Sequence, residues 1–182
     1  HNLLTELEKH GEPLDHFAPD LELIESVSEV ANIVASFETA ECLTAIAVGS
    51  GKDPLSAKLI GLALSDSASR AVYIPLGHEP PKVVRDSDGN PTLALDPPKS
   101  QNLPVLSDPA MAPLKTLLES NGPKVGHDLK YTMQLLSRNE VTLGGVDSDT
   151  AFDTQVASYC LDPARRDRSM ATLAPDRLNT QL

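Results

Sequence analysis

The stretch that decides the fold is Leu43–Leu76, LTAIAVGSGKDPLSAKLIGLALSDSASRAVYIPL. It contains three runs of aliphatic and β-branched residues, at 43–48, 59–64 and 71–76, each bounded by Gly, Ser, Asp or Pro. Such bounded runs are typical of β-strands. The segments between them are short enough for hairpins, so we expect three consecutive strands in an antiparallel meander.

Upstream of the meander, the sequence predicts one helix and a short edge strand. From Ser26 to about Cys42, apolar residues recur at helical spacing. Ser26 or Ser28 can cap this helix, and Glu29 stands three residues after Ser26, as in a capping box. Leu21–Ile24 alternates briefly and predicts the edge strand.

Downstream of the meander, residues 78–105 are rich in proline and predict a long surface loop. Helices are then expected after the caps Asp108, Asp128 and Asp153, and from Ser169 onward. Two brief strands are expected at 124–126 and 141–146. Strands first and then alternating strands and helices indicate an α/β or α+β arrangement of packed layers.

Composition narrows the function classes. The chain has 182 residues with 26 Asp and Glu against 15 Lys and Arg, a formal charge of −11, and its only basic cluster is the short Arg165-Arg166-Asp167-Arg168. Tight autonomous nucleic-acid binding is therefore not expected, because neutralisation of phosphates supplies most of that affinity. No apolar run approaches the roughly 18 residues that span a bilayer. Cys42 and Cys160 lack CxxC spacing, which favours a reducing, cytoplasmic setting.

The ends of the sequence indicate a piece of a longer chain. Residues 1–19 are polar, with Gly11, Pro13 and Pro19, and are interpreted as an interdomain linker or the tail of a preceding module. Residues 20–182 are interpreted as one domain, truncated at its C-terminal end.

Four ordered segments resemble the proofreading domain of bacterial DNA polymerase I. Val125–Tyr131 reads VGHDLKY, where the second exonuclease motif of that family reads roughly V-G-x-N-L-K-Y-D. Residues 151–163, AFDTQVASYCLDP, are similar to the family's downstream F-D-T…S-Y-L-L-D-P segment. Residues 57–64 and 72–78 resemble its second and third strands. The resemblance implies an α/β, ribonuclease H-like fold, a mixed sheet flanked by helices.

The resemblance also implies a two-metal nuclease mechanism. Two divalent ions roughly 3.5–4 Å apart activate water and stabilise the leaving oxygen. Such hard cations need carboxylate oxygens, which the family supplies from an Asp-x-Glu on its first strand, the Asp that closes its second motif and a later Asp. The first three fall here on Ile46, Val48 and Thr132, and the last is expected beyond Leu182. We therefore predict no catalytic residues, no metal and no cofactor in this chain.

Other chemistry-bearing residues are expected to have structural roles. Phe37-Glu38-Thr39-Ala40-Glu41 is superficially similar to the family's F-D-T-E-T, but it lies in a helical pattern, so Glu38 and Glu41 are expected to face solvent. The Asp147-x-Asp149 pair, the isolated His78 and His127, and the Gly49-Ser50-Gly51-Lys52 turn lack the surrounding residues of a calcium, catalytic or phosphate site.

The leading hypothesis is a vestigial 3′–5′ exonuclease-like domain that serves as a structural spacer. Its partners would be the polymerase and 5′ nuclease domains of the same parent chain, with DNA bound through the polymerase and weakly or not at all by this domain alone. One alternative is an active metal-dependent nuclease with relocated acids such as Asp53, Asp128 or Asp153. Another is a regulatory protein-binding module unrelated to replication.

Overall fold

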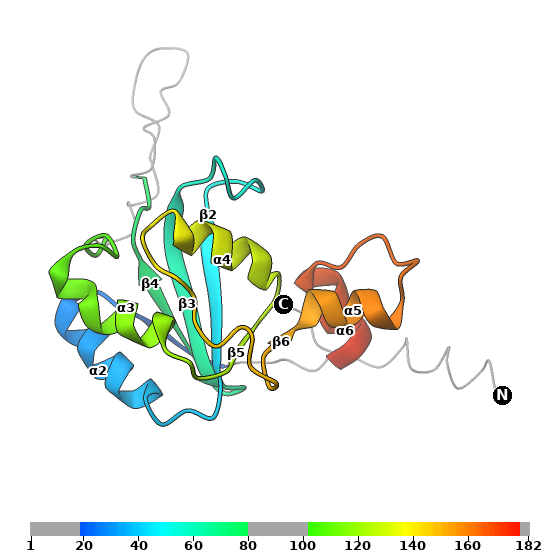
Figure 1. Cartoon of the computed structure of the whole chain (residues 1–182), viewed down its shortest axis with the longest axis horizontal. Coiled ribbons are helices and arrows are strands. Elements are labelled where there is room, and N and C mark those ends of the chain that lie inside the picture. The colour runs from blue at the N-terminus through cyan, green and yellow to red at the C-terminus, as the bar shows by residue number, and fades with distance from the viewer. Residues whose placement is uncertain (1–18, 80–101, 179–182) are drawn as a thin grey trace, which may run out of the picture.

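A mixed six-stranded sheet organises the molecule, with strand order β1-β4-β3-β2-β5-β6 (Figure 1). The computed structural model describes residues 19–79 and 102–178. The strands are β1 (Asp20–Leu23), β2 (Leu43–Gly49), β3 (Leu59–Ser67), β4 (Arg70–Pro75), β5 (Lys124–Gly126) and β6 (Phe152–Asp153). The helices are α2 (Val27–Phe37), the 3-10 turn η1 (Pro109–Met111), α3 (Ala112–Glu119), α4 (Leu129–Ser137), α5 (Thr154–Leu161) and α6 (Met170–Leu178).

The expected meander is confirmed. β2 pairs antiparallel with β3, and β3 pairs antiparallel with β4, so that Leu62 lies between Ala47 and Ile74. β1 is the edge strand predicted from the sequence and runs parallel to β4. On the other side, β5 runs parallel to β2 and β6 runs parallel to β5. The architecture is thus α/β with a mixed sheet.

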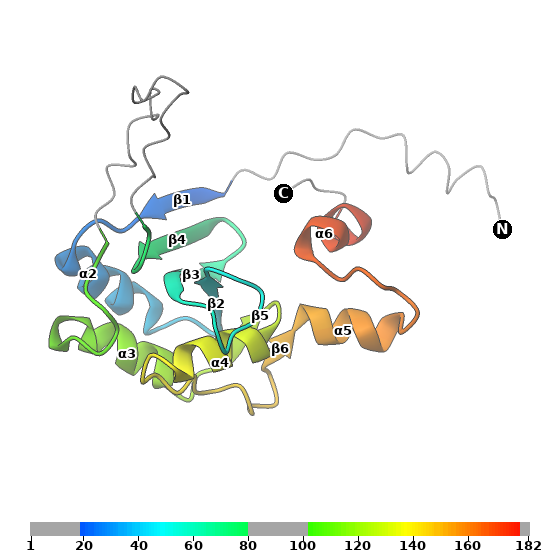
Figure 2. The ribbon, with the colours of Figure 1, turned by 90° about the horizontal axis from the view of Figure 1, so that it is seen from above.

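The two faces of the sheet differ. Helices α2, α3 and α4 lie along one face (Figure 2). The alternate strand residues on that face form the core; Ala45, Leu62, Leu64, Val72 and Ile74 are each at most 1% exposed. The alternate positions Ile46, Val48, Ala63 and Tyr73 point to the opposite face and are only half-buried. Helices α5 and α6 extend beyond the β6 edge, away from α2 and α3 (Figure 1).

Two predicted elements are corrected. Residues 141–146 form no strand; instead Val141 and Leu143 are 1% and 4% exposed in an irregular segment packed on the core. The alternating apolar residues of this segment therefore indicate burial against the core and not strand pairing. The strand that pairs with β5 at the edge of the sheet is β6, Phe152–Asp153. Helix α2 stops at Phe37 rather than near Cys42, because the Ala40 N–H bonds to the Phe37 carbonyl in a turn that leads into β2.

The N-terminus of α2 has a modified form of the predicted capping box. Ser26 Oγ accepts a hydrogen bond from the Glu29 N–H at 3.3 Å. The Glu29 carboxylate accepts its bond from the N–H of Glu25 at 2.8 Å, one residue before the cap. The bond to Ser26 Oγ satisfies an N–H group that the helix leaves without an intrahelical partner, and the bond to Glu29 fixes the residue before the cap.

Most of the predicted surface loop at 78–105 lies outside the described residues. Within the described part of the chain, no helix has the length and apolar character needed to cross a membrane.

Candidate functional site

Ile46 and Val48 occupy the sheet position where the resemblance expects the first pair of carboxylates. They lie two residues apart on β2, so both side chains point to the same, less covered face of the sheet. Their partners on β3 are Ala63 and Gly61. Both side chains are hydrocarbon and offer a metal no donor atom.

Thr132 lies against the same segment of β2. It is 1% exposed on α4, and its Oγ1 accepts a hydrogen bond from the Ala47 N–H at 3.2 Å. β5 pairs with β2 only at Leu43 and Thr44, so β5 does not reach this N–H. Since Ala47 stands between Ile46 and Val48, Thr132 lies beside the backbone of the same strand segment, while the Ile46 and Val48 side chains point to the less covered face of the sheet.

The donor set of this cluster does not fit a pair of divalent cations. Mg²⁺ and Mn²⁺ are hard ions that bind carboxylate oxygens in such sites. Ile46 and Val48 supply carbon only, and the neutral Thr132 hydroxyl already accepts a backbone hydrogen bond. No step of metal-assisted hydrolysis can therefore be assigned to these residues.

Asp153 joins two helix N-termini. One of its carboxylate oxygens accepts hydrogen bonds from the N–H groups of Gln155 at 2.8 Å and Val156 at 3.3 Å in α5, and of Asp128 at 3.2 Å. The other accepts from the Leu129 N–H at 2.7 Å, at the start of α4. The predicted cap of α5 is confirmed, and the same carboxylate also binds the N-terminus of α4.

Asp128 and Asp53 are likewise engaged in local structure. Asp128 adopts a left-handed backbone conformation, with φ of 56°, and caps α4 through the Tyr131 N–H at 3.1 Å. Asp53 accepts from the Leu55 N–H at 3.0 Å and from Ser56 Oγ at 2.8 Å. The hydrogen bond from the Leu55 N–H, and then that from Ser56, lowers the pKa of the Asp53 carboxyl.

The remaining candidates are dispersed. Glu38, Glu41, Asp147 and Asp149 are exposed. His78 Nε2 lies 2.7 Å from the Tyr73 hydroxyl, and His127 Nδ1 lies 2.8 Å from the Thr154 hydroxyl. Across residues 19–79 and 102–178, no three His, Cys, Asp or Glu side chains gather closely enough to hold a metal ion.

The Gly49–Lys58 loop is fixed by α4 through contacts that the sequence did not reveal. The Tyr131 hydroxyl donates to the Gly51 carbonyl at 2.6 Å, and Arg138 donates to the carbonyls of Pro54 and Ala57. A Cβ atom at Gly49 would overlap the Tyr131 hydroxyl oxygen. Glycine at this position leaves room for the Tyr131 hydroxyl where the loop leaves β2, and the Gly49–Lys52 segment is a structural turn.

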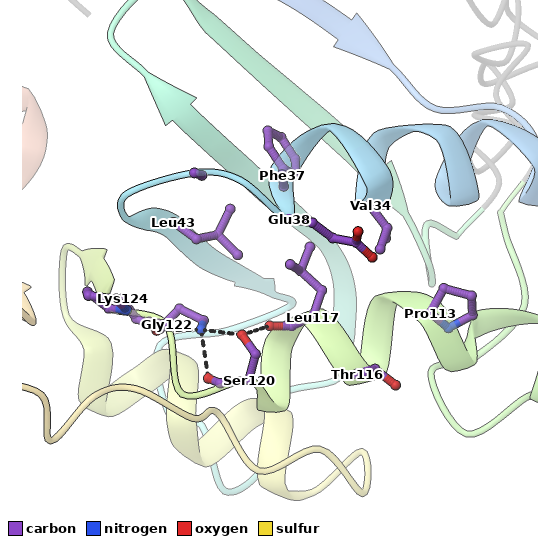
Figure 3. A pocket seen from close by; sticks show the side chains of 12 residues that line it. Val34, Phe37, Glu38, Leu43, Pro113, Thr116, Leu117, Ser120, Gly122 and Lys124 are labelled. Atoms are coloured by element: carbon purple, nitrogen blue, oxygen red, sulfur yellow. Dashed lines mark hydrogen bonds between the residues drawn. The ribbon is translucent and has the colours of Figure 1, made fainter.

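A buried lysine is a second unpredicted feature. Lys124 is 1% exposed and lines a cavity of about 320 Å³ between α2, α3 and the strand starts (Figure 3). Its Nζ donates to the carbonyls of Gly122 at 2.8 Å and Ser120 at 3.0 Å, and to Ser120 Oγ at 3.3 Å. Burial lowers the pKa of this ammonium group. Lys124 thereby ties the end of α3 to β5.

The comparison with protein families gives one assignment. Residues 22–182 match the family described as 3′–5′ exonuclease, that of A-type DNA polymerases. The matched residues include all four segments that carry the resemblance.

Solved structures share the fold. The POL domain of Pol1 from M. smegmatis, in complex with DNA primer-template and dNTP, aligns with a TM-score of 0.61 at 22% identity, over 89% of this chain and 23% of that chain. Escherichia coli RNase D aligns with a TM-score of 0.57 at 14% identity, over 90% and 34%. Trypanosoma brucei RNase D, complexed with RNA U12, aligns with a TM-score of 0.61 at 11% identity, over 91% of this chain and 49% of that chain. The expected ribonuclease H-like fold is confirmed, and this chain spans half or less of each of these proteins.

Proposed function

Because the chain belongs to the 3′–5′ exonuclease family of A-type DNA polymerases, we propose that it is a vestigial member of that family, a module of a longer polymerase chain that no longer hydrolyses DNA. The single observation that carries this proposal is the cluster of Ile46, Val48 and Thr132. None of the three positions where the resemblance expects a carboxylate has one, and Thr132 is hydrogen-bonded to the strand that carries Ile46 and Val48.

The replacements are physically reasonable. Carboxylates that converge on a metal site repel one another when the metal is absent, and each then resists ionisation. Neutral side chains remove this repulsion, and substitutions that relieve a strained active site commonly stabilise a fold. The half-buried Ile46 and Val48 also gain from the removal of apolar surface from water.

The remaining role is that of a structural spacer. In this proposal residues 1–19 are an interdomain linker, and residues 20–182 are the exonuclease-like domain. The domain packs against the polymerase module of the parent chain and positions it relative to a 5′ nuclease module, within the cytoplasm. DNA is bound through the polymerase, since the formal charge of −11 gives this domain little attraction for phosphate.

The alternative, an active nuclease, would use Asp53, Asp128 and Asp153 as relocated metal ligands. The hydrogen bonds that these three acids already accept favour the inactive module instead. Asp153 serves two helix N-termini, Asp128 caps α4 and Asp53 holds its own turn. A metal ion would compete with these hydrogen bonds at each acid.

Two measurements on the isolated domain test the proposal. Isothermal titration with Mn²⁺ is expected to give no high-affinity heat, and a 3′-labelled single-stranded oligonucleotide is expected to stay intact in Mg²⁺ or Mn²⁺. Degradation that depends on Mn²⁺ and disappears in Asp53→Asn, Asp128→Asn or Asp153→Asn would instead establish the relocated site. An active homologous domain with its carboxylates in place serves as the positive control.

A further inference from the structure

The loop between α5 and α6 carries the basic cluster Arg165-Arg166-Asp167-Arg168, and Ser169 follows it directly (Figure 1). Residues 162–169 contain no helix or strand, and Ser169 is exposed. Arginines therefore stand one, three and four residues before an exposed serine. Ser169 is the only serine in the sequence with an arginine three residues before it.

This pattern is typical of the substrates of one class of protein kinases. Such kinases select by charge, because carboxylates in their substrate groove pair with arginines upstream of the acceptor hydroxyl. The acceptor segment must also lie in the groove as an extended peptide. The irregular loop at 162–169 can take that form, whereas the neighbouring hydroxyl, that of Thr172, lies within α6. Ser169 is thus the acceptor that the loop offers.

The arginines of the loop differ in how they are used. Arg165 forms an ion pair with Asp176 and is engaged within the fold. Arg166 forms no ion pair across residues 19–79 and 102–178. Arg168 Nη2 donates to two carbonyls just after α5, at 3.1 and 3.0 Å, but its buried Nε has no hydrogen-bond partner among the described residues. Arg166 and Arg168 therefore keep donors for an anion.

A cavity of about 550 Å³ lies beside Ser169. One side of it is α5, including Tyr159, and the other is formed by residues 166–169. The Arg168 guanidinium lies 5.0 Å from the centroid of the Tyr159 ring, a cation–π contact that holds it at the cavity. The Asp167 carboxylate also lines the cavity and accepts from the Ser169 N–H at 2.9 Å. Two arginines against one acid leave a positive wall next to Ser169, which favours a phosphoryl group of charge about −2.

We propose that Ser169 is a phosphorylation site for a protein kinase that selects arginine three residues before the acceptor. In the transfer, the bond from Ser169 Oγ to the γ-phosphorus of ATP forms, and the bond from that phosphorus to the β–γ bridging oxygen breaks. The hydroxyl proton passes to a base of the kinase, and ADP leaves. The phosphoryl group then accepts hydrogen bonds from Arg166 and from Arg168 Nε, which fixes the loop against α5. This modification does not depend on whether the chain hydrolyses DNA.

Phosphate transfer to the folded chain tests whether Ser169 is recognised. The 182-residue chain is incubated with ATP and the catalytic domain of such a kinase, and tandem mass spectrometry locates the phosphate. Phosphate is expected at Ser169 and is expected to be lost in Ser169→Ala. Arg166→Ala should slow the transfer at least about tenfold, the factor that a charge pair of about 1.4 kcal/mol produces.

Arg177→Ala is the matched control for Arg166→Ala. Arg177 is also exposed and forms no ion pair in the part of the chain that the structure describes, so its removal should leave the rate unchanged. A synthetic peptide of residues 160–175 separates the motif from the fold. Phosphate on the peptide and none on the folded chain would overturn the proposal, because Ser169 would be inaccessible. Phosphate on neither would overturn it as well, because the arginines would not be recognised.

A ³¹P nuclear magnetic resonance titration tests where the phosphoryl group is held. The second pKa of phosphoserine is ordinarily about 6, and neighbouring cations favour the dianion and lower this pKa. The phosphorylated chain is therefore expected to titrate at lower pH than the phosphorylated peptide. Arg166→Gln and Arg168→Gln should each move the pKa of the chain towards that of the peptide, and Arg177→Gln should not. Equal pKa values in the chain and the peptide would show that the folded arginines do not hold the phosphoryl group, and would overturn its assignment to this cavity.

Discussion

Thr132 Oγ1 accepts a hydrogen bond at 3.2 Å from the backbone N–H of Ala47, across the edge of β2 that β5 leaves unpaired. The family's second motif ends at this position with an acid, and here the same position supplies a neutral acceptor to the strand that carries Ile46 and Val48. The position at which the resemblance expects an acid is thus part of the packing between α4 and the sheet.

Replacing Thr132 tests that structural role. Thr132→Val keeps the shape and removes the acceptor, so the buried Ala47 N–H loses its partner and the free energy of unfolding is expected to fall by about 1–3 kcal/mol. Thr132→Ser keeps the hydroxyl and loses one methyl group, and this loss is expected to lower the free energy of unfolding by about 1 kcal/mol. Urea denaturation measures both. Equal stability of the valine variant and the wild type would show that the hydrogen bond contributes nothing.

Asp153 is expected to be more important than an ordinary helix cap. Its carboxylate accepts from N–H groups of both α4 and α5, so Asp153→Ala removes two caps at once. A single lost cap costs about 0.5–2 kcal/mol, and the expected loss in the free energy of unfolding is therefore about 1–4 kcal/mol. Ser26→Ala, which removes the single side-chain cap of α2, is the matched control and should lose less. The expectation fails if the two variants unfold at the same urea concentration.

Glu29 gives the stability a predictable pH dependence. The hydrogen bond from the Glu25 N–H, and then that from Ser26, lowers the pKa of the Glu29 carboxyl below its ordinary value of 4.5. A carboxyl with a lowered pKa in the folded state stabilises the fold above its ordinary value and loses that contribution as the pH falls through the folded-state pKa. Glu29→Gln should therefore be less stable than the wild type at about pH 7, with the difference shrinking below about pH 4. Urea titrations at both pH values measure it, and a constant difference would contradict this account.

Parts of this structure were predictable because their determinants are local. The runs around Ala45, Leu62 and Ile74 alternate between a buried and a less covered face, and alternation is the direct signature of a strand. The caps Ser26, Asp128 and Asp153 were predictable for the same reason, since each binds an N–H within a few residues. Alternation misled at Val141 and Leu143, where a loop buries alternate side chains against the core without strand pairing.

The features that the sequence did not predict depend on contacts between residues far apart in the chain. Asp153 and Leu129 are 24 residues apart, and Tyr131 and Gly51 are 80 residues apart, so neither bond leaves a local pattern. Lys124 was missed because a lysine is normally exposed, and its buried ammonium is satisfied by carbonyls that only the folded chain brings together. The positions Ile46, Val48 and Thr132 were found by resemblance to a family, and the hydrogen bond that joins Thr132 to this segment of β2 came from the structure.

The last prediction restores the carboxylates. The triple variant Ile46→Asp, Val48→Glu, Thr132→Asp is expected to be less stable than the wild type without metal, because apolar burial is lost and the new charges repel one another. Mn²⁺ should then raise its free energy of unfolding, by about 2.7 kcal/mol at a concentration of 100 times the dissociation constant. The wild type and an Ile46→Ala, Val48→Ala, Thr132→Ala control should not respond. Stabilisation of the wild type by Mn²⁺ would reveal a metal site elsewhere, and a triple variant indifferent to Mn²⁺ would show that the three side chains do not converge on one point.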